Sequence, residues 1–209
     1  MRKIILLVIC TLCLYSVHAQ LTQKAIDQMF KTTWNPQKNK VGIWDDAVNS
    51  DGFRQVCGVH RVTNSTTPKS DLFIGMVALG KGDDVVYRVN FFTWRNFAIH
   101  VKEDSPFLIK LGDDSRMDCV VTYANDDLLP IVRSAMGVTV TLYPAIISFD
   151  VTDEQMQELS KGIKKVRYEV NNNVEDLTLK KDNISAFLVE EYNYLKEIMS
   201  KERHFDDGF

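Results

Sequence analysis

The sequence predicts a mainly β fold: an antiparallel sandwich or barrel-like domain with an N-terminal helix, a short helix near residues 153–161 and a C-terminal helix. Between residues 53 and 151, short runs rich in β-branched and aromatic residues are separated by Gly, Asp, Asn and Pro. This spacing is typical of short strands joined by turns, and seven such runs favour a sandwich or a barrel. The expected strands are residues 54–62, 72–79, 84–93, 97–101, 107–111, 117–123 and 138–149.

Residues 85–91 show the strand pattern most clearly. Every second residue is apolar, as at Val89 and Phe91, and the polar residues Arg88 and Asn90 lie between them. Successive side chains of a strand point to opposite faces, so this segment predicts one buried face. Three breaks carry paired aspartates after Gly or Asn, which suits tight turns because Asp side chains accept hydrogen bonds from turn amides. These breaks are Gly82-Asp83-Asp84, Gly112-Asp113-Asp114 and Asn125-Asp126-Asp127.

A strand–helix–strand unit is expected after the β-rich region. Thr152 and Gln155 stand three residues apart as a capping box, which predicts a helix start at this point. Gly162 is a suitable residue to end that helix. Alternating apolar residues then predict a strand over residues 163–170, and a further strand is expected over residues 174–179.

Helical spacing of apolar residues marks the two ends of the mature chain. Residues 21–33 are expected to form an amphipathic helix, followed by a polar connector. Residues 184–201 are expected to form the C-terminal helix, because apolar residues recur there at i, i+4, i+7 and i+11. These residues are Leu188, Tyr192, Leu195 and Met199.

The first residues of the chain predict an export signal. Two basic residues precede an apolar run of about a dozen residues, and Val17 and Ala19 occupy the positions that signal peptidase reads. The run is shorter than the roughly 20 residues that a membrane-spanning helix needs. We therefore expect cleavage before Gln20, a secreted or periplasmic protein and no transmembrane segment after cleavage. The expected organisation is a signal peptide at 1–19, an N-terminal helix and connector at 20–52, and a single β-rich domain with its C-terminal helix at 53–209.

The charge balance argues against a nucleic-acid partner. The chain has 25 basic and 28 acidic residues, and two of the basic residues leave with the signal peptide. Binding of nucleic-acid phosphates needs clustered Lys and Arg. One basic cluster is present, at Lys161, Lys164, Lys165 and Arg167, and we interpret it as a solvated edge.

Two cysteines remain after signal cleavage, Cys57 and Cys119. In an oxidising compartment a pair of cysteines suggests one disulfide, which would close a loop of about 60 residues. Both cysteines lie in expected strands that can be neighbours. The alternative is two buried thiols.

The sequence predicts no cofactor, no metal site and no catalytic residue. The histidines His60, His100 and His204 are far apart and form no close ligand pair of the kind that zinc sites show. The paired aspartates lack the ordered spacing of a calcium loop. There is no Gly-x-Ser-x-Gly elbow and no glycine-rich phosphate loop. The sequence does not exclude a carboxylate pair for glycoside hydrolysis, because any two of the many acids could face each other.

An aromatic segment is the candidate ligand platform. Phe92, Trp94, Arg95 and Asn96 follow one expected strand and lead into the next. If the odd-numbered residues of this strand point inward, Phe92 and Trp94 point the other way and could bind a sugar ring or a protein. The alternative is that a second layer covers this face and makes these rings part of the core.

Two segments carry a resemblance to a known group of proteins. Residues 107–115, an apolar strand that ends in a Gly-Asp-Asp-Ser turn, and residues 147–167, which contain the capping box, resemble a pattern in uncharacterised small exported β-rich proteins of Gram-negative bacteria, especially gut anaerobes. The Val17-His18-Ala19-Gln20 junction is similar to their signal cleavage sites. The resemblance covers about residues 70–170. It implies a bacterial envelope location and no assigned activity, and it carries over no functional residue.

These observations favour an exported, soluble, non-enzymatic binding or interaction module of the cell envelope, with a protein or glycan partner. The alternative is a hydrolase that acts on an envelope polymer. An enzyme would gather acids, histidines or Arg95 in one pocket with shifted pKa values, whereas a binding module would expose an aromatic or apolar patch. The oligomeric state stays open, since the N-terminal helix could dock on a second copy.

Overall fold

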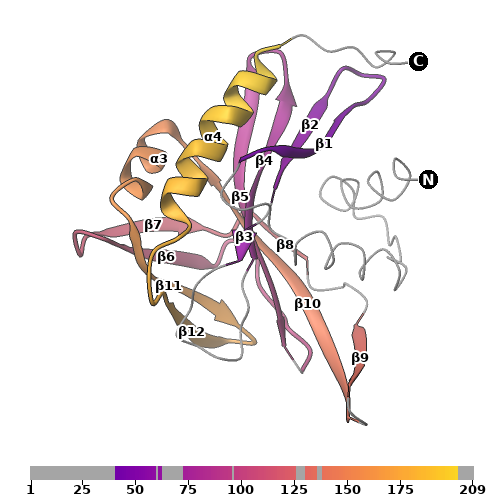
Figure 1. Ribbon diagram of the computed structural model, residues 1–209, viewed down its shortest axis with the longest axis vertical. Coiled ribbons are helices and arrows are strands. Elements are labelled where there is room, and N and C mark those ends of the chain that lie inside the picture. The colour runs from indigo at the N-terminus through magenta and orange to yellow at the C-terminus, as the bar shows by residue number, and fades with distance from the viewer. Residues whose placement is uncertain are drawn as a thin grey trace.

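The computed structural model describes residues 41–59, 61–62, 73–95, 97–125, 130–135 and 138–201. In this part the protein is mainly β, with two antiparallel sheets and two helices (Figure 1). The mainly β class and the two later helices are therefore confirmed. The expected signal peptide and N-terminal helix lie outside the described residues.

The larger sheet contains eight of the described strands. Its main path follows the order β1–β2–β4–β5–β10–β8, with β3 paired to β4 and β9 paired to β10. The long strands β4, β5 and β10 form its centre, and every pairing is antiparallel. The strands are β1 (Ile43–Val48), β2 (Arg54–Gly58), β3 (Arg61–Val62), β4 (Phe73–Lys81), β5 (Asp84–Arg95), β8 (Tyr123–Asn125), β9 (Ile131–Ala135) and β10 (Val138–Val151).

The smaller sheet has the order β12–β11–β6–β7 and is also antiparallel. Asn171 and Asn172 join β11 to β12 in a tight hairpin, and both have positive φ, 51° and 60°. A two-residue turn with positive φ at both positions matches the twist of paired strands, and Asn tolerates it well. The strands are β6 (Pro106–Leu111), β7 (Arg116–Val120), β11 (Ile163–Val170) and β12 (Asn173–Thr178).

Two helices complete the described fold. Helix α3 (Asp153–Leu159) begins with the predicted capping box, in which Thr152 and Gln155 each accept the other's backbone N–H. Helix α4 (Ser185–Met199) packs against β2, β4 and α3. In Figure 1 it crosses obliquely over the larger sheet beside α3.

Several segments differ from the expected strands. The run expected over 117–123 is divided between β7 of the smaller sheet and β8 of the larger sheet. Residues 97–101 form no strand; instead, the side-chain amide of Asn171 accepts from His100 N at 2.7 Å and donates to the carbonyl of Ala98 at 2.9 Å. The segment lies where the chain leaves β5 for the smaller sheet, and its polar groups are satisfied by that turn. Conversely, β1 and β9 were not expected, because each is defined by its pairing with a partner strand, β2 or β10.

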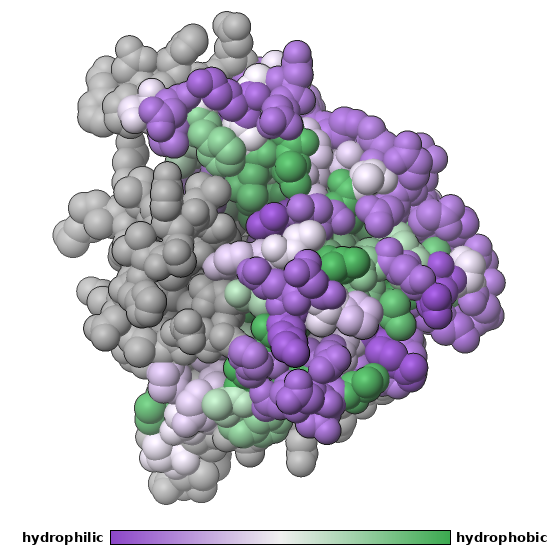
Figure 2. All heavy atoms as spheres, turned by 180° about the vertical axis from the view of Figure 1, so that it is seen from behind, coloured by the Kyte–Doolittle hydropathy of each residue, from purple (hydrophilic) through white to green (hydrophobic). Residues whose placement is uncertain are grey.

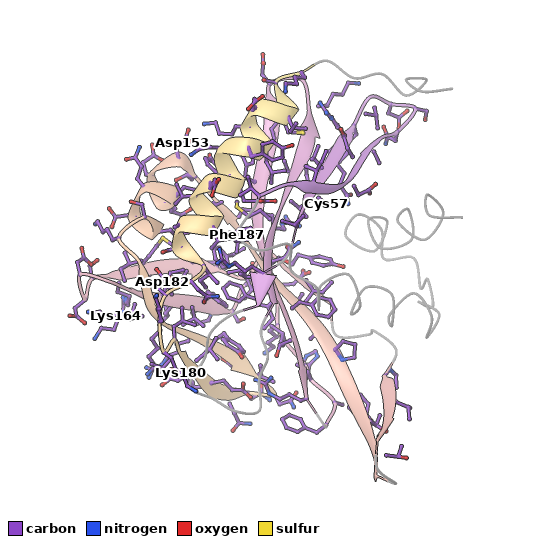
Figure 3. The ribbon with its side chains drawn as sticks, in the orientation of Figure 1. Cys57, Asp153, Lys164, Lys180, Asp182 and Phe187 are labelled. Carbon is purple, nitrogen blue, oxygen red and sulfur yellow. The ribbon has the colours of Figure 1, made fainter. Side chains whose placement is uncertain are left out.

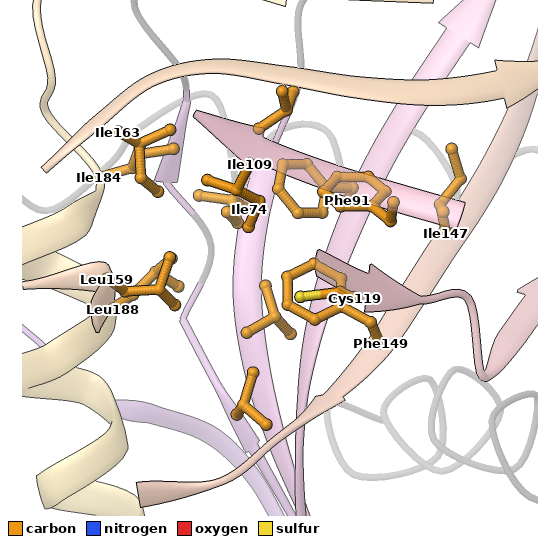
Figure 4. Close-up of a cluster of buried hydrophobic side chains, with 14 of the residues drawn as sticks. Ile74, Phe91, Ile109, Cys119, Ile147, Phe149, Leu159, Ile163, Ile184 and Leu188 are labelled. Atoms are coloured by element: carbon orange, nitrogen blue, oxygen red, sulfur yellow. The ribbon is translucent and has the colours of Figure 1, made fainter. Parts of the chain in front are cut away.

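One hydrophobic core fills the space between the two sheets and α4. Phe107 of the smaller sheet lies at its centre, with no exposed surface. Its ring centroid is 4.8 Å from that of Phe91, 4.9 Å from that of Phe149 and 5.8 Å from that of Tyr168. Figure 4 shows Phe91 and Phe149 of the larger sheet within this cluster. The aromatic rings therefore bind the two sheets to each other.

The expected disulfide between Cys57 and Cys119 is not formed, and that prediction is wrong for this structure. Both residues are buried as thiols. Val56 of β2 points into the main core, so its neighbour Cys57 points to the opposite face, where it packs beside Val77 and Leu79. Cys119 lies in the main core, where burial raises its pKa to about 12. Cys119 of the smaller sheet lies in the core between the sheets, whereas Cys57 lies on the other side of the larger sheet, so the larger sheet separates the two thiols.

Candidate functional site

The outward face of the smaller sheet carries a row of three cations. The strand register places Lys165 of β11 opposite Lys110 of β6, and Lys110 opposite Arg116 of β7. We call these three residues the basic row. Like charges directly opposite each other repel within a sheet, and each of the three cations has a carboxylate partner nearby. Figure 2 shows mostly hydrophilic residues on the side of the molecule where this sheet lies.

A β-bulge brings one more cation to the basic row. The register between β11 and β6 shifts between Ile163 and Lys165, so two residues of β11 face one residue of β6. As a result, the consecutive residues Lys164 and Lys165 both lie outside the core, while Ile163 and Val166 on either side are buried. In Figure 3, Lys164 points away from the body of the molecule. A regular strand would have turned one of these two lysines inward.

The turn between β6 and β7 holds a carboxylate beside the basic row. Asp114 has a φ of 69°, and its side chain lies 2.8 Å from Lys110 Nζ and 2.9 Å from Lys164 Nζ. Hydrogen bonds from these two lysines lower the pKa of Asp114 to about 2. Gly112 of the same turn donates its N–H to the Gly162 carbonyl at 3.0 Å, so the turn is tied to the loop before β11.

A second row of outward residues borders the first. It consists of Asp176, Arg167, Leu108 and Asp118, which the register places side by side on β12, β11, β6 and β7. Asp176 lies 2.5 Å from Lys165 and 2.6 Å from Arg167. Hydrogen bonding to Arg167, followed by the hydrogen bond from Lys165, holds the pKa of Asp176 well below its usual range. Asp118 lies 2.6 Å from Arg116.

The two rows enclose a shallow hollow of about 320 Å³. Five cations and three carboxylates belong to this surface, and two of the carboxylates are each shared by two cations. The surface therefore has an excess of positive charge on a chain whose formal net charge is −3. The hollow is lined by Leu108, Lys110, Asp114, Arg116, Lys165 and Arg167.

The chemistry of this hollow suits binding of an anion rather than catalysis. A general acid needs a carboxyl pKa raised toward neutrality, whereas the pKa values of Asp114 and Asp176 are lowered. No Ser, Cys or His lines the hollow. Within the described ranges, no group of three or more His, Cys, Asp or Glu residues is placed to hold a metal ion.

The structure describes the side chains of two residues of the expected aromatic platform, Phe92 and Arg95. Phe92 is buried, with 8% of its surface exposed. Strand β5 pairs with β4 and β10 without a register shift, so Phe92 and Arg95, three residues apart, lie on opposite faces. Asn96 and the side chain of Trp94 lie outside the described part of the structure. The alternative interpretation, in which this face is covered, holds for Phe92.

Arg95 instead links the two sheets. Its Nη2 atom lies 2.5 Å from a carboxylate oxygen of Glu175 and 3.2 Å from the Tyr168 hydroxyl, and its Nη1 atom donates to the Thr93 hydroxyl at 2.7 Å. Burial raises the pKa of Tyr168 to about 12, so it stays protonated and donates to Glu175 at 3.3 Å. Because the Arg95 side chain is only 10% exposed, we interpret this cluster as a structural contact between the sheets.

Sequence reasoning found three of the five cations of the basic surface. It singled out Lys164, Lys165 and Arg167 but interpreted them as a solvated edge. Lys110 was missed, although it stands at an outward position of the strand expected at 107–111. Arg116 was missed because the next expected strand began at residue 117, whereas β7 begins at Arg116. Only the register of β6 against β7 and β11 brings all of them together.

No protein-family model, no curated protein and no solved structure matches this chain. Among the residues that the structure describes, neither helix has the length and apolar character needed to cross a membrane.

Proposed function

We propose that this protein is an exported, non-enzymatic binding module, and that it binds an anionic ligand in the hollow on its smaller sheet. The observation that carries this proposal is the basic row, in which Lys165, Lys110 and Arg116 stand directly opposite one another on three adjacent strands. The three carboxylate partners reduce the repulsion within the row, and an anion lying between the three side chains would reduce it further.

The neighbouring acids do not remove the positive charge of the hollow. Asp114 forms ion pairs with both Lys110 and Lys164, and Asp176 forms ion pairs with both Lys165 and Arg167. Each of these carboxylates therefore balances only one of its two cations. Exposed ion pairs of this kind are weak, at about 0–1 kcal/mol. An anionic ligand can therefore compete for the cations without a large loss of existing interactions.

A hydrolase is the weaker candidate on this geometry. Glu191 is the carboxyl group whose pKa is raised most toward neutrality among the described acids, to about 8. Its side chain is fully enclosed, with no exposed surface, and so it cannot reach a substrate. The exposed acids of the hollow have lowered pKa values and are poor proton donors.

The finer fold and the location are part of the same proposal. A sandwich-like arrangement of the two sheets is supported by the contacts of Phe107 with Phe91 and Phe149. A bacterial envelope location is supported by the signal-like residues at 1–19 and by the resemblance over about residues 70–170.

We expect the protein to be cleaved before Gln20 when it is expressed with its own N-terminus in a Gram-negative host. The reason is the short apolar run followed by Val17 and Ala19. Intact mass spectrometry of protein purified from the periplasm or medium checks this. Protein that stays in the cytoplasm at full mass would contradict export.

We expect a variant lacking the basic row to lose most of its affinity for acidic polymers. The triple variant Lys110→Gln, Arg116→Gln, Lys165→Gln should bind a carboxylated polysaccharide roughly tenfold more weakly than the native protein, since each exposed ion pair contributes up to about 1 kcal/mol. Isothermal titration calorimetry at low and moderate salt measures this, with neutral dextran as the reference polymer.

A second triple variant serves as the matched control. Lys81→Gln, Lys102→Gln and Lys201→Gln remove the same charge from residues that do not line the hollow. It should bind like the native protein, and both variants should keep the native far-ultraviolet circular dichroism. Equal losses in the two variants, or no preference of the native protein for acidic over neutral polymer, would overturn the proposed function.

A further inference from the structure

We propose that the ligand of the basic row is a linear acidic polysaccharide with one carboxylate per sugar, lying along the row and therefore across the strands. This inference rests on the proposed function and adds to it the class and the orientation of the ligand. Three observations carry it: the direction of the row, its width and the spacing of its charges.

The direction follows from where the cations are. Across the strands, Lys165, Lys110 and Arg116 follow one another without interruption. Along β6 and β7 this continuity fails, because the next outward residue is Leu108 on β6 and Asp118 on β7. On β11 the next outward residue is Arg167, which is paired with Asp176. A chain with regular negative charges engages Lys110 and Arg116 together with Lys165 only when it crosses the strands.

The width of the ligand that fits the basic row is limited by carboxylates on both sides of the row. Asp114 borders the basic row at the β6–β7 turn. On the other side, the second row begins and ends with an acid, Asp176 and Asp118. These carboxylates repel any polyanion wider than a single chain. Between the two acids of the second row, the side chain of Leu108 offers an apolar contact for the C–H face of a sugar ring.

The charge spacing favours a sugar chain over a peptide. Adjacent strands are about 4.8 Å apart, so the three cations are spaced by about the length of one sugar unit in an extended chain. In an extended acidic peptide, side chains on one face are about 6.6 Å apart, which is a poorer match to this spacing. Single-stranded nucleic acid needs aromatic rings for base stacking, and no aromatic residue lines the hollow.

The test is a length series of oligogalacturonates, with affinity measured by calorimetry on the mature protein. We expect affinity to rise roughly tenfold from the monomer to the trimer, as successive carboxylates engage the row. For longer oligomers the gain should be small, because Thr178 follows Lys165 at one end of the row and β7 is the sheet edge at the other. The same oligomers with their carboxylates reduced to alcohols should not bind.

Two variants test the orientation. Lys110→Gln interrupts the row at its centre and should flatten the rise in affinity with length, whereas Arg167→Gln removes a cation of the second row and should leave the rise in place. Both positions are exposed, so native circular dichroism and melting are expected for each.

The outcomes separate this inference from the proposed function. If inorganic phosphate or the galacturonate monomer binds as tightly as the trimer, and the triple variant of the basic row abolishes that binding, the proposed function stands and the extended chain is wrong. Tighter binding of an acidic peptide or an oligonucleotide of matched charge would likewise overturn the ligand class. If no anion binds, both proposals fail.

Discussion

Between pH 4.5 and pH 8 the protein is expected to lose stability, on the order of 4 kcal/mol, through the titration of Glu191. Burial raises the pKa of Glu191 from 4.5 to about 8. The folded state therefore binds this proton more tightly than the unfolded state. In such a case stability is fully present below the unfolded pKa and is lost as the pH rises to the folded pKa.

The surroundings of Glu191 explain why its charge is costly. The side chain projects from α4 onto the end of β2, has no exposed surface and accepts N–H bonds from Val59 at 2.9 Å and Gly42 at 3.4 Å. These two hydrogen bonds favour the charged form, but burial outweighs them, and the nearby charge of Glu190 raises the pKa further. No cation is among the groups that shift the pKa of Glu191. Gly58 makes room for it, since a Cβ there would lie 2.0 Å from Glu191 Oε1.

Acids on the smaller sheet produce the opposite dependence at lower pH. The pKa values of Asp114 and Asp176 are lowered by hydrogen bonds from Lys110 and Arg167 respectively. Their contribution is present above the unfolded pKa of 3.8 and is lost as the pH falls below it. Stability should consequently be highest at about pH 4–5, and the fall above that range belongs to Glu191.

Urea denaturation at several pH values measures this profile. Glu191→Gln removes the titration and should make stability nearly independent of pH between pH 5 and pH 8, so that the variant is the more stable protein at the upper end. Glu190→Gln is the matched control, because it removes the same charge from the adjacent, exposed position of α4. It should keep the fall in stability above pH 5, reduced only by the small contribution that the Glu190 charge makes to the raised pKa of Glu191. Parallel native and Glu191→Gln profiles would show that the carboxylate is not held neutral.

Replacing Phe107 by alanine is expected to destabilise the protein by about 3–5 kcal/mol, the usual cost of deleting a fully buried phenylalanine. The ring has no exposed surface and contacts Phe91, Phe149 and Tyr168. It is the aromatic residue through which the smaller sheet touches two strands of the larger one. Its loss leaves a cavity between the sheets that a stiff β core closes poorly. Urea denaturation measures the change in the free energy of unfolding.

The control for this prediction is Phe97→Ala. Phe97 is 47% exposed and lies outside the core, so its removal should change stability by less than about 1 kcal/mol. Equal effects of the two substitutions would mean that the sheets are not held together at Phe107.

Local features of this protein could be predicted from its sequence. The capping box at Thr152 and Gln155 begins α3 as expected, because both partners lie within one helical turn. The strand over Val89 and Phe91 has its predicted buried face, because alternation is a property of the strand itself. Each of these depends on residues a few positions apart.

Features that depend on pairing between distant segments were decided by the tertiary structure. The sequence predicts that Cys57 and Cys119 lie in strands, but only sheet packing places them on opposite sides of the larger sheet. It shows Lys165 and Arg167 as outward residues, but only the register with β6 and β7 sets Lys110 and Arg116 beside them. The sequence predicts a helix over residues 184–201, which contain Glu191, but the burial of its side chain follows from how α4 lies on β2. Strand register and packing are set by contacts across the whole core. The sequence of one strand therefore does not specify which strand pairs with it.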